Sequence, residues 1–297
     1  NLAHQNVQQA IKELERLTRF IKVLGCYPCE SVKPTQLSQA QLLIEPDSSK
    51  NTELTTSNTE LSEAKYSREY KSQDSEVHCK HLQVGGSHFG AFQFVSNPQN
   101  ETELASLAKQ SKETGFQAII LHQSATFLSD NKLKKYFQII EQAGLVSVIY
   151  IEHEADITCS HLADMVMLSG QNMYNQDLLE QLGCLNLPVI IERNHIASLE
   201  DWLSSAQTVL TKGNQQVILC DSGIRSFAKP DTISLDLSSL VAVKQTCHLP
   251  IICNISHEIE TLGYAQAKAA KQLHSNGIVL PYPNTTASSR LLHELYQ

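Results

Sequence analysis

Long apolar runs and clusters of basic residues are both missing from this 297-residue chain. No run approaches the roughly 20 apolar residues that cross a bilayer, and no basic, apolar and small-residue pattern of a signal peptide is present. The 23 lysines and arginines are spread out among 31 acidic residues, for a net charge of −8. These absences argue against nucleic-acid and membrane partners, and we expect a cytoplasmic protein.

A compact cysteine framework is missing as well. The eight cysteines are spread over the chain, at positions 26, 29, 79, 159, 184, 220, 247 and 253. Cys220 and Cys253 lie in apolar runs, where a free thiol behaves as a small hydrophobic side chain. Scattered thiols in a long chain are typical of a reducing compartment and not of a disulfide scaffold.

The first third of the chain has little to build a core from. Residues 4–24 carry apolar side chains at helical spacing on one face, which predicts a helical segment within 1–31. Large apolar residues then become rare, and Ser, Thr, Asn and Glu dominate. Such a composition cannot bury enough surface to offset its ordering entropy, so we predict a flexible, low-complexity linker over 32–84.

From about residue 85, apolar runs alternate regularly with helix-like segments. Apolar runs lie at 89–95, 117–122, 147–152, 165–169, 188–192, 217–221, 250–254 and 278–282, with helix-like segments between them, for example at 101–114, 131–143, 198–211 and 259–274. Continuous apolar runs indicate strands buried on both faces, hence a parallel sheet. Eight such units predict a (β/α)8 TIM barrel over 85–297. A doubly wound sheet is the alternative, but no G-x-G-x-x-G follows a strand.

In a barrel of this kind, chemistry takes place at the carboxyl ends of the strands. Reading those ends gives Ser96, His122, Glu152, His153, Gln171, Glu192, Arg193, Asp221, Arg225, Asn254, His257, Pro281 and Tyr282. None of the serines among them stands in a nucleophile-elbow motif, so the sequence does not indicate a hydrolase triad.

Three motifs carry a family resemblance: N-M-x-N at 172–175, GN…VILC…GIR at 213–225, and Ser-His at 256–257. Together they resemble the 3-deoxy-7-phosphoheptulonate (DAHP) synthases, most closely the smaller class related to the octulosonate-phosphate (KDO8P) synthases. The resemblance covers about 88–297. It implies a barrel that condenses phosphoenolpyruvate with erythrose 4-phosphate in the shikimate pathway of aromatic amino acid biosynthesis.

The family holds a divalent metal with a Cys, a His, a Glu and an Asp. By the resemblance, the His is retained as His257, whereas the Cys position falls near Ser96, the Glu position at Pro281 and the Asp position near Arg290. One imidazole holds a divalent ion poorly. The resemblance therefore implies no resident cofactor, with a divalent metal at His257 as the alternative.

The substrate anchors of the family have changed too. Its lysine after the fifth strand is Glu192, its Gly-Ala-Arg arginine is Gln171, and its Cys-Glu-Arg-Gly-Ile-Arg motif has become Cys220 to Arg225, with Asp221 and Ser222 inside it. The two phosphorylated substrates together carry about four negative charges. At ~5 Å and an effective dielectric near 20, each charge contact is worth ~3 kcal/mol in either direction, and exchanging a lysine for a carboxylate turns the attraction into repulsion. We therefore expect the parent activity to be lost.

Several candidate sites have a structural alternative. His257 either binds a metal with Glu152, Glu192 or Asp221, or is a leftover imidazole. Arg225 and Arg193 either bind a small anion or form structural ion pairs with the neighbouring carboxylates. His122 and Glu152 are further ligand-binding candidates.

A second candidate site combines Cys26 and Cys29 with Cys79 and His81. These residue types and spacings suit a structural zinc ion that joins the two ends of the linker. The alternative is that they are free thiols and an unrelated histidine.

The sequence leaves three functions open. The first is a pseudoenzyme: a regulatory, scaffold or ligand-binding oligomer that pairs with itself or with an active DAHP synthase through residues 1–24. The second is an enzyme with altered acid–base or metal chemistry, using Glu152, Glu192 and Asp221 together with the three histidines His122, His153 and His257. The third is a working synthase with unusual ligands.

Overall fold

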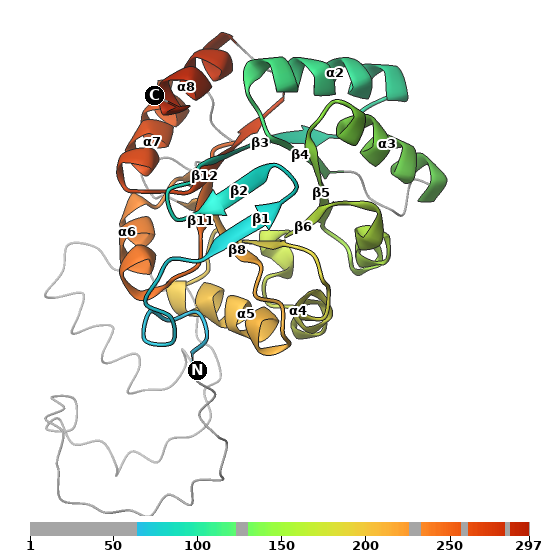
Figure 1. Cartoon of the computed structure of the whole chain (residues 1–297). Coiled ribbons are helices and arrows are strands. Elements are labelled where there is room, and N and C mark those ends of the chain that lie inside the picture. The colour runs from blue at the N-terminus through green and yellow to red at the C-terminus, as the bar shows by residue number, and fades with distance from the viewer. Residues whose placement is uncertain (1–63, 123–129, 226–232, 257–260, 283–285, 297) are drawn as a thin grey trace, which may run out of the picture. The chain divides into compact units, whose positions relative to one another are not determined.

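The computed structural model describes residues 64–122, 130–225, 233–256, 261–282 and 286–296. Eight parallel strands close into a barrel in the order β11-β12-β3-β4-β5-β6-β7-β8 (Figure 1). They are β3 (Gly90–Ser96), β4 (Ala118–His122), β5 (Val146–Ile151), β6 (Met165–Leu168), β7 (Val189–Glu192), β8 (Val217–Asp221), β11 (Ile251–Asn254) and β12 (Gly277–Pro281). The predicted (β/α)8 barrel is confirmed, and the doubly wound alternative is wrong.

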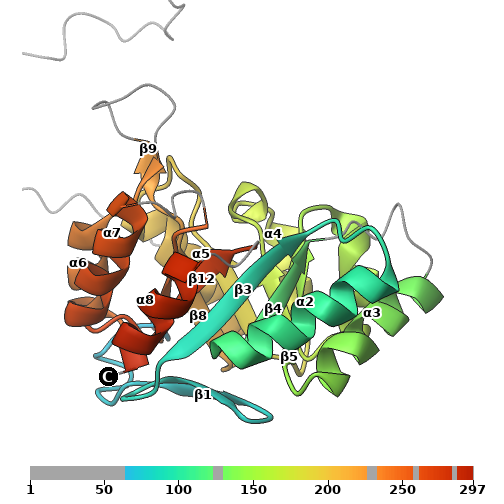
Figure 2. The ribbon, with the colours of Figure 1, turned by 90° about the horizontal axis from the view of Figure 1, so that it is seen from above.

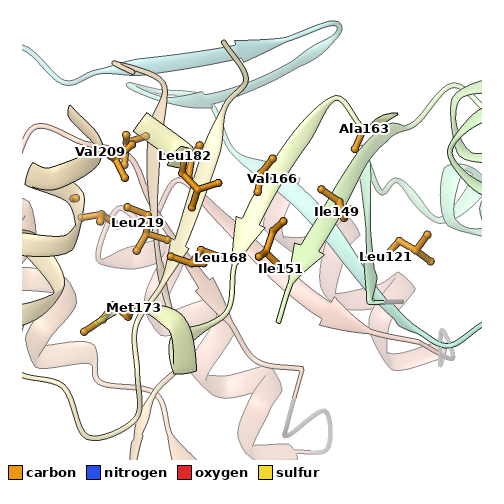
Figure 3. Close-up of a cluster of buried hydrophobic side chains, with 14 of the residues drawn as sticks. Leu121, Ile149, Ile151, Ala163, Val166, Leu168, Met173, Leu182, Val209 and Leu219 are labelled. Atoms are coloured by element: carbon orange, nitrogen blue, oxygen red, sulfur yellow. The ribbon is translucent and has the colours of Figure 1, made fainter. Parts of the chain in front are cut away.

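Both faces of each barrel strand are buried, which is why the strands read as continuous apolar runs. In β5, Val146 and Val148 belong to the cluster inside the barrel, whereas Ile149 and Ile151 belong to the cluster between the sheet and the helices (Figure 3). Each fully buried aliphatic side chain of this size stabilises the fold by about 1.5–3 kcal/mol. The two apolar layers therefore hold the strand ends, and the polar groups on them, in fixed positions.

Helices cover the outside of the barrel. They are α2 (Glu101–Thr114), α3 (Asp130–Gln142), α4 (Gln176–Gly183), α5 (Leu199–Thr211), α6 (Leu237–Thr246), α7 (Thr261–Gln272) and α8 (Thr286–Tyr296), with the 3-10 helices η3 (Glu154–Leu162) and η4 (Gly170–Asn172) after β5 and β6. The side chains of Asn100, Asn175, Ser198 and Asp236 accept backbone N–H groups at helix starts, which fixes where those helices begin. Among the described residues, none of the helices combines the length and the hydrophobicity that a membrane span requires.

A β-hairpin closes the amino-terminal end of the barrel. Its strands are β1 (Glu76–Cys79) and β2 (Leu82–Gly85), and it presents Val77, Leu82 and Val84 to the apolar cluster inside the barrel. Figure 2 shows this hairpin at the opposite end of the barrel from the short strand β9 (Ile224–Arg225). The described residues 64–84 are therefore folded, which corrects the predicted extent of the linker. Their short apolar alternation is buried by tertiary contacts that composition alone does not reveal.

Residues 64–75, here called the strap, precede the hairpin and lie along the connection between α6 and β11. His248 joins the two segments from the barrel side. Its Nε2 lies 2.7 Å from the Lys65 carbonyl oxygen, and its Nδ1 lies 2.9 Å from Oγ of Ser75, which also accepts a hydrogen bond from Nζ of Lys71. A neutral ring that donates from Nε2 and accepts at Nδ1 satisfies all these partners.

Acid should weaken this strap. Burial lowers the pKa of His248, with smaller contributions from the charges of Lys71 and Arg68. The unfolded chain therefore binds this proton more readily than the folded chain does, so stability is present at neutral pH and is lost as the pH falls through the ordinary histidine range. We expect the free energy of unfolding to decline between pH 7.5 and 5.5, as measured by urea denaturation.

The matched variants are His248→Gln and the exposed His88→Gln. His248→Gln should cost about 1–3 kcal/mol at pH 7.5 and flatten the decline toward pH 5.5, whereas His88→Gln should leave both unchanged. An equally steep decline in His248→Gln would show that another group carries the pH dependence.

Candidate functional site

The carboxyl ends of the strands carry the polar residues that the sequence singled out. Ser96 and His122 end β3 and β4, Glu192 and Asp221 end β7 and β8, and Asn254 and Pro281 end β11 and β12. Glu152 follows β5, and Gln171 lies in η4 after β6. The barrel thus gathers residues that are far apart in the sequence at one end, here called the mouth.

Glu192 is the centre of a hydrogen-bond network at the mouth. Tyr150 OH and the Gly170 N–H donate to its Oε2 at 2.7 and 3.1 Å, and Ser222 Oγ and Asn254 Nδ2 donate to its Oε1 at 2.5 and 3.0 Å. Only 7% of the residue is exposed. Burial, together with the charge of Glu192, raises the pKa of Tyr150, so the phenol stays protonated as a donor. Four donors leave this carboxylate little capacity for a ligand.

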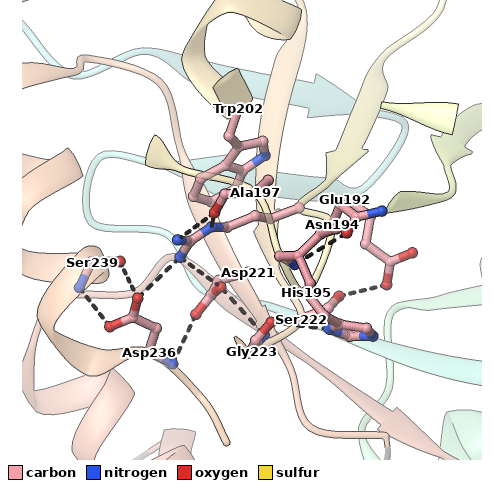
Figure 4. Close-up of polar contacts among 12 residues, drawn as sticks. Glu192, Asn194, His195, Ala197, Trp202, Asp221, Ser222, Gly223, Asp236 and Ser239 are labelled. Atoms are coloured by element: carbon pink, nitrogen blue, oxygen red, sulfur yellow. Dashed lines mark hydrogen bonds and ion pairs between the residues drawn. The ribbon is translucent and has the colours of Figure 1, made fainter. Parts of the chain in front are cut away.

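Arg193 lies next to Glu192 but serves a different, buried network (Figure 4). Its Nη1 lies 3.1 Å from Asp236 Oδ2 and 3.7 Å from Asp221 Oδ1, while Nε and Nη2 both donate to the Ala197 carbonyl oxygen. Its guanidinium also lies over the Trp202 ring, 5.8 Å from the centroid. The charge of Arg193 is therefore neutralised by the protein itself.

The two carboxyl groups around Arg193 differ in environment. Burial raises the pKa of Asp221 to about 6, although the charge of Arg193 acts against that rise. Burial also acts to raise the pKa of Asp236, but hydrogen bonds from Ser239 and Arg193 outweigh it, and the pKa is lowered. Asp236 is at the same time the N-cap of α6. The sequence analysis missed Asp236, whose signal was the capping pattern Asp-Leu-Ser-Ser before an apolar helix.

Arg225 lies apart from the barrel strands. It belongs to the two-stranded sheet formed by β9 and β10 (Ile233–Ser234), where its backbone N–H donates to the His195 carbonyl oxygen at 3.2 Å. Gly223 permits this turn with a φ of +80°, and an added Cβ would lie 2.6 Å from the Ser234 carbonyl oxygen. The Arg225 residue is exposed, and within the described part of the chain no ion pair joins it to Asp221 or Glu192.

Ser96, His122 and Glu152 form a row of contacts at the mouth, here called the contact line, at the ends of β3, β4 and β5. Glu152 Oε2 lies 2.7 Å from His122 Nε2, and Ser96 Oγ lies 3.4 Å from His122 Nδ1. The rings of Phe94 and Tyr150 pack beside the imidazole, with centroids at 5.7 and 5.0 Å. Sequence reasoning named Ser96, His122 and Glu152 one by one but did not predict that they touch.

A cavity of about 180 Å³ lies next to the Glu192 network. It is lined by Tyr150, Gly170, Gln171, Glu192, Arg193, Asn194 and His195. The polar groups of Asn194 are already bonded, since Nδ2 donates to the Gly170 carbonyl oxygen and Oδ1 accepts from the Ile196 N–H. The cavity suits a small polar molecule and presents no uncompensated cation among its lining residues.

The described positions do not fit the metal of the DAHP synthases. Pro281 supplies no side-chain donor, and Arg290 pairs with Glu294 on α8, with Nε 3.1 Å from Oε1. Ser96 offers a hydroxyl group that lies against His122. His257 lies outside the described residues, and no cluster of three or more metal-ligating side chains occurs in the part of the chain that the structure describes.

The second metal candidate is only partly visible. Cys26 and Cys29 lie outside the described residues. Cys79 is buried against the Asp164 carbonyl oxygen, 3.6 Å from Sγ, and burial raises its pKa to about 11. His81 is exposed on the hairpin turn. A protonated, buried thiol is a poor zinc ligand, and the zinc site remains a prediction.

The fold and its mouth define a (β/α)8-barrel protein with an acidic, internally hydrogen-bonded site at the carboxyl ends of its strands. Residues 126–280, just over half of the chain, match the DAHP synthetase I family. The chain belongs to that family, and the resemblance found in the sequence is confirmed.

The chain is also similar to individual proteins, over very different shares of its length. A phospho-2-dehydro-3-deoxyheptonate aldolase of Thermotoga maritima is 25% identical over 225 residues, which cover 72% of this chain and 67% of the relative. A truncated 3-deoxy-D-arabino-heptulosonate 7-phosphate synthase of the same organism matches in structure with a TM-score of 0.69 at 24% identity, over 77% of this chain and 92% of that one. A bifunctional chorismate mutase/prephenate dehydratase of Enterobacter agglomerans shares 53% identity over 36 residues, 12% of this chain and 9% of that enzyme.

Proposed function

We propose that this chain is a DAHP-synthase-like protein of aromatic amino acid biosynthesis that no longer condenses phosphoenolpyruvate with erythrose 4-phosphate. It acts instead as a regulatory, scaffold or ligand-binding partner, either with a second copy or with an active synthase. The similarity to a phospho-2-dehydro-3-deoxyheptonate aldolase and to a bifunctional chorismate mutase/prephenate dehydratase supports the pathway. The observation that carries the loss of activity is the Glu192 carboxylate, held by four donors at the position where the family resemblance places a lysine.

Charge is the physical reason. Phosphorylated substrates need cations in a partly dry site. Glu192 supplies the opposite sign, and Arg193 is already paired with Asp221 and Asp236. Desolvating a phosphate beside a carboxylate costs several kcal/mol, and the residues that line the cavity beside Glu192 present no free cation to offset that cost. Ser96 and Pro281 provide no carboxylate or thiolate ligand for a metal ion, whose positive charge would otherwise compensate the negative charge of Glu192.

The test is a turnover assay on the full chain. Phosphoenolpyruvate consumption should not exceed the blank with erythrose 4-phosphate and Mn²⁺, while the Thermotoga maritima relative serves as the active control. Metal-dependent turnover at a rate near that of the control would refute the proposal.

The partner is tested separately. Light scattering on the purified chain, alone and mixed with an active DAHP synthase, distinguishes self-association from a mixed complex. A thermal-shift series with aromatic amino acids and phosphosugars tests ligand binding, since a ligand at 100 times its Kd stabilises by about 2.7 kcal/mol.

A further inference from the structure

The contact line Ser96–His122–Glu152 has the order of a nucleophile, a base and an orienting carboxylate. The three residues come from neighbouring strand ends, and the register of β3 and β4 places Ser96 directly beside His122. The distances are 3.4 Å from Ser96 Oγ to His122 Nδ1 and 2.7 Å from His122 Nε2 to Glu152 Oε2. An unliganded site often shows such a nucleophile–base contact slightly long.

The hydrogen bonds define the tautomer of His122. An ionised Glu152 only accepts hydrogen bonds, so Nε2 of the imidazole carries the proton. The neutral ring then presents a lone pair at Nδ1, and the Ser96 hydroxyl donates to it. Phe94 and Tyr150 pack against the ring and restrict its rotation. The base is therefore oriented toward the hydroxyl before any substrate arrives.

The surroundings limit the substrate class. Ser96 is exposed, whereas the side chains of His122 and Glu152 keep 26% and 32% of their surface accessible. Besides Glu152 itself, two carboxylates contact the described residues of this line: Glu192 accepts from Tyr150 OH, and Asp156 accepts from the Glu152 N–H. Phe94 and Tyr150 add apolar surface. This environment repels anions and favours an uncharged or cationic acyl group.

We propose that Ser96 is a nucleophilic serine that accepts an acyl group from an uncharged ester or thioester, with His122 as general base and Glu152 as its positioning residue. Oγ attacks the carbonyl carbon, the bond from that carbon to the alcohol or thiol breaks, and the hydroxyl proton passes through Nδ1 to the leaving group. Water then cleaves the acyl-serine by the same route. This activity is separate from the loss of the parent condensation, and either can fail without the other.

The first test uses 4-nitrophenyl acetate. The protein should release one equivalent of nitrophenolate per chain in a burst, and peptide mass spectrometry should find the acetyl group on Ser96. Ser96→Ala should abolish that adduct, and His122→Gln should slow it at least about 100-fold. The control His161→Gln, an exposed histidine on η3, should react as the native protein does. Absence of an adduct at Ser96, or an unchanged rate in His122→Gln, would overturn the proposal.

The role of Glu152 has its own readout. Glu152→Gln keeps a hydrogen-bonding side chain but removes the negative charge that stabilises the imidazolium. We expect acetylation of Ser96 to slow about 10-fold and its pH midpoint to move toward acid, with the melting temperature retained. A slower rate with an unmoved midpoint would show that Glu152 does not act through the charge of His122.

A further variant tests the base independently of the ester. Ser96→Cys places a thiol at the same position, and His122 should keep it ionised at lower pH than in Ser96→Cys/His122→Gln. Alkylation by iodoacetamide at pH 6 should be at least about 10-fold faster in the single variant. Equal alkylation rates would exclude His122 as the base for this atom.

Discussion

Replacing Glu192 with lysine, the residue type that the family resemblance assigns to this position, is expected to destabilise the fold by about 3–5 kcal/mol. Tyr150 OH, the Gly170 N–H, Ser222 Oγ and Asn254 Nδ2 all donate toward the Glu192 carboxylate. An ammonium group accepts nothing, so these donors would lose their acceptor in a buried place and face a positive charge. Urea denaturation at pH 7.5 measures the loss.

The matched control is Gln171→Arg, which also introduces the residue type that the family resemblance assigns to its position. Gln171 is exposed in η4, so an arginine there should change the free energy of unfolding by less than about 0.5 kcal/mol. If Glu192→Lys were as stable as the native protein and bound inorganic phosphate, the mouth would still tolerate a lysine at position 192 and bind an anion with it. The case for lost phosphate chemistry would then fail.

The barrel was predictable because its strands are buried on both faces. Runs such as Val217–Asp221 and Val189–Glu192 are buried throughout, and eight such runs in succession leave few alternatives. The hairpin β1–β2 was not predictable, because its short strands alternate apolar and polar residues within a polar segment. What secures it is the apolar cluster inside the barrel, which is contributed by strands far along the chain.

The site was predictable only as a set of positions. The resemblance placed Glu192 at the position of a family lysine, but the donors to its carboxylate lie 42 residues before it, at Tyr150, and 62 residues after it, at Asn254. The structural role of Arg193 could not be separated in sequence from an anion-binding role, because its partner Asp236 lies 43 residues away. Hydrogen-bond partners of this kind depend on strand order and register, which sequence patterns determine only after the fold is known.

The same limit applies to Ser96, His122 and Glu152. Each stood at a predicted strand end, yet no local motif joined them, since they are 26 and 30 residues apart. Neighbouring parallel strands bring such residues together only when their registers agree. The pairing of Ser96 with His122 across β3 and β4 provides that agreement.

Arg193→Met is expected to cost about 3–5 kcal/mol at pH 8, because it leaves the buried carboxylate of Asp221 without its cation. Asp221 is only 1% exposed, and burial already raises its pKa to about 6 with Arg193 in place. A raised folded-state pKa means that this group favours the fold below about pH 4 and that the contribution is lost as the pH rises toward 6. The cost of Arg193→Met should therefore be smaller at pH 5, where Asp221 is largely protonated.

The double variant Arg193→Met/Asp221→Asn separates the buried charge from lost packing. The amide introduced by Asp221→Asn would carry no charge at any pH, and its oxygen would still accept from the Gly223 N–H, which donates to Asp221 Oδ1 at 3.3 Å. We expect the double variant to recover about 1–3 kcal/mol of the loss at pH 8 and to remove the difference between pH 5 and pH 8. If it were no more stable than Arg193→Met, the loss would come from the Asp236, Ala197 and Trp202 contacts of the guanidinium. Arg193 would then stabilise the segment before α5 by packing and hydrogen bonding, and the charge of Asp221 would not contribute to the loss of stability.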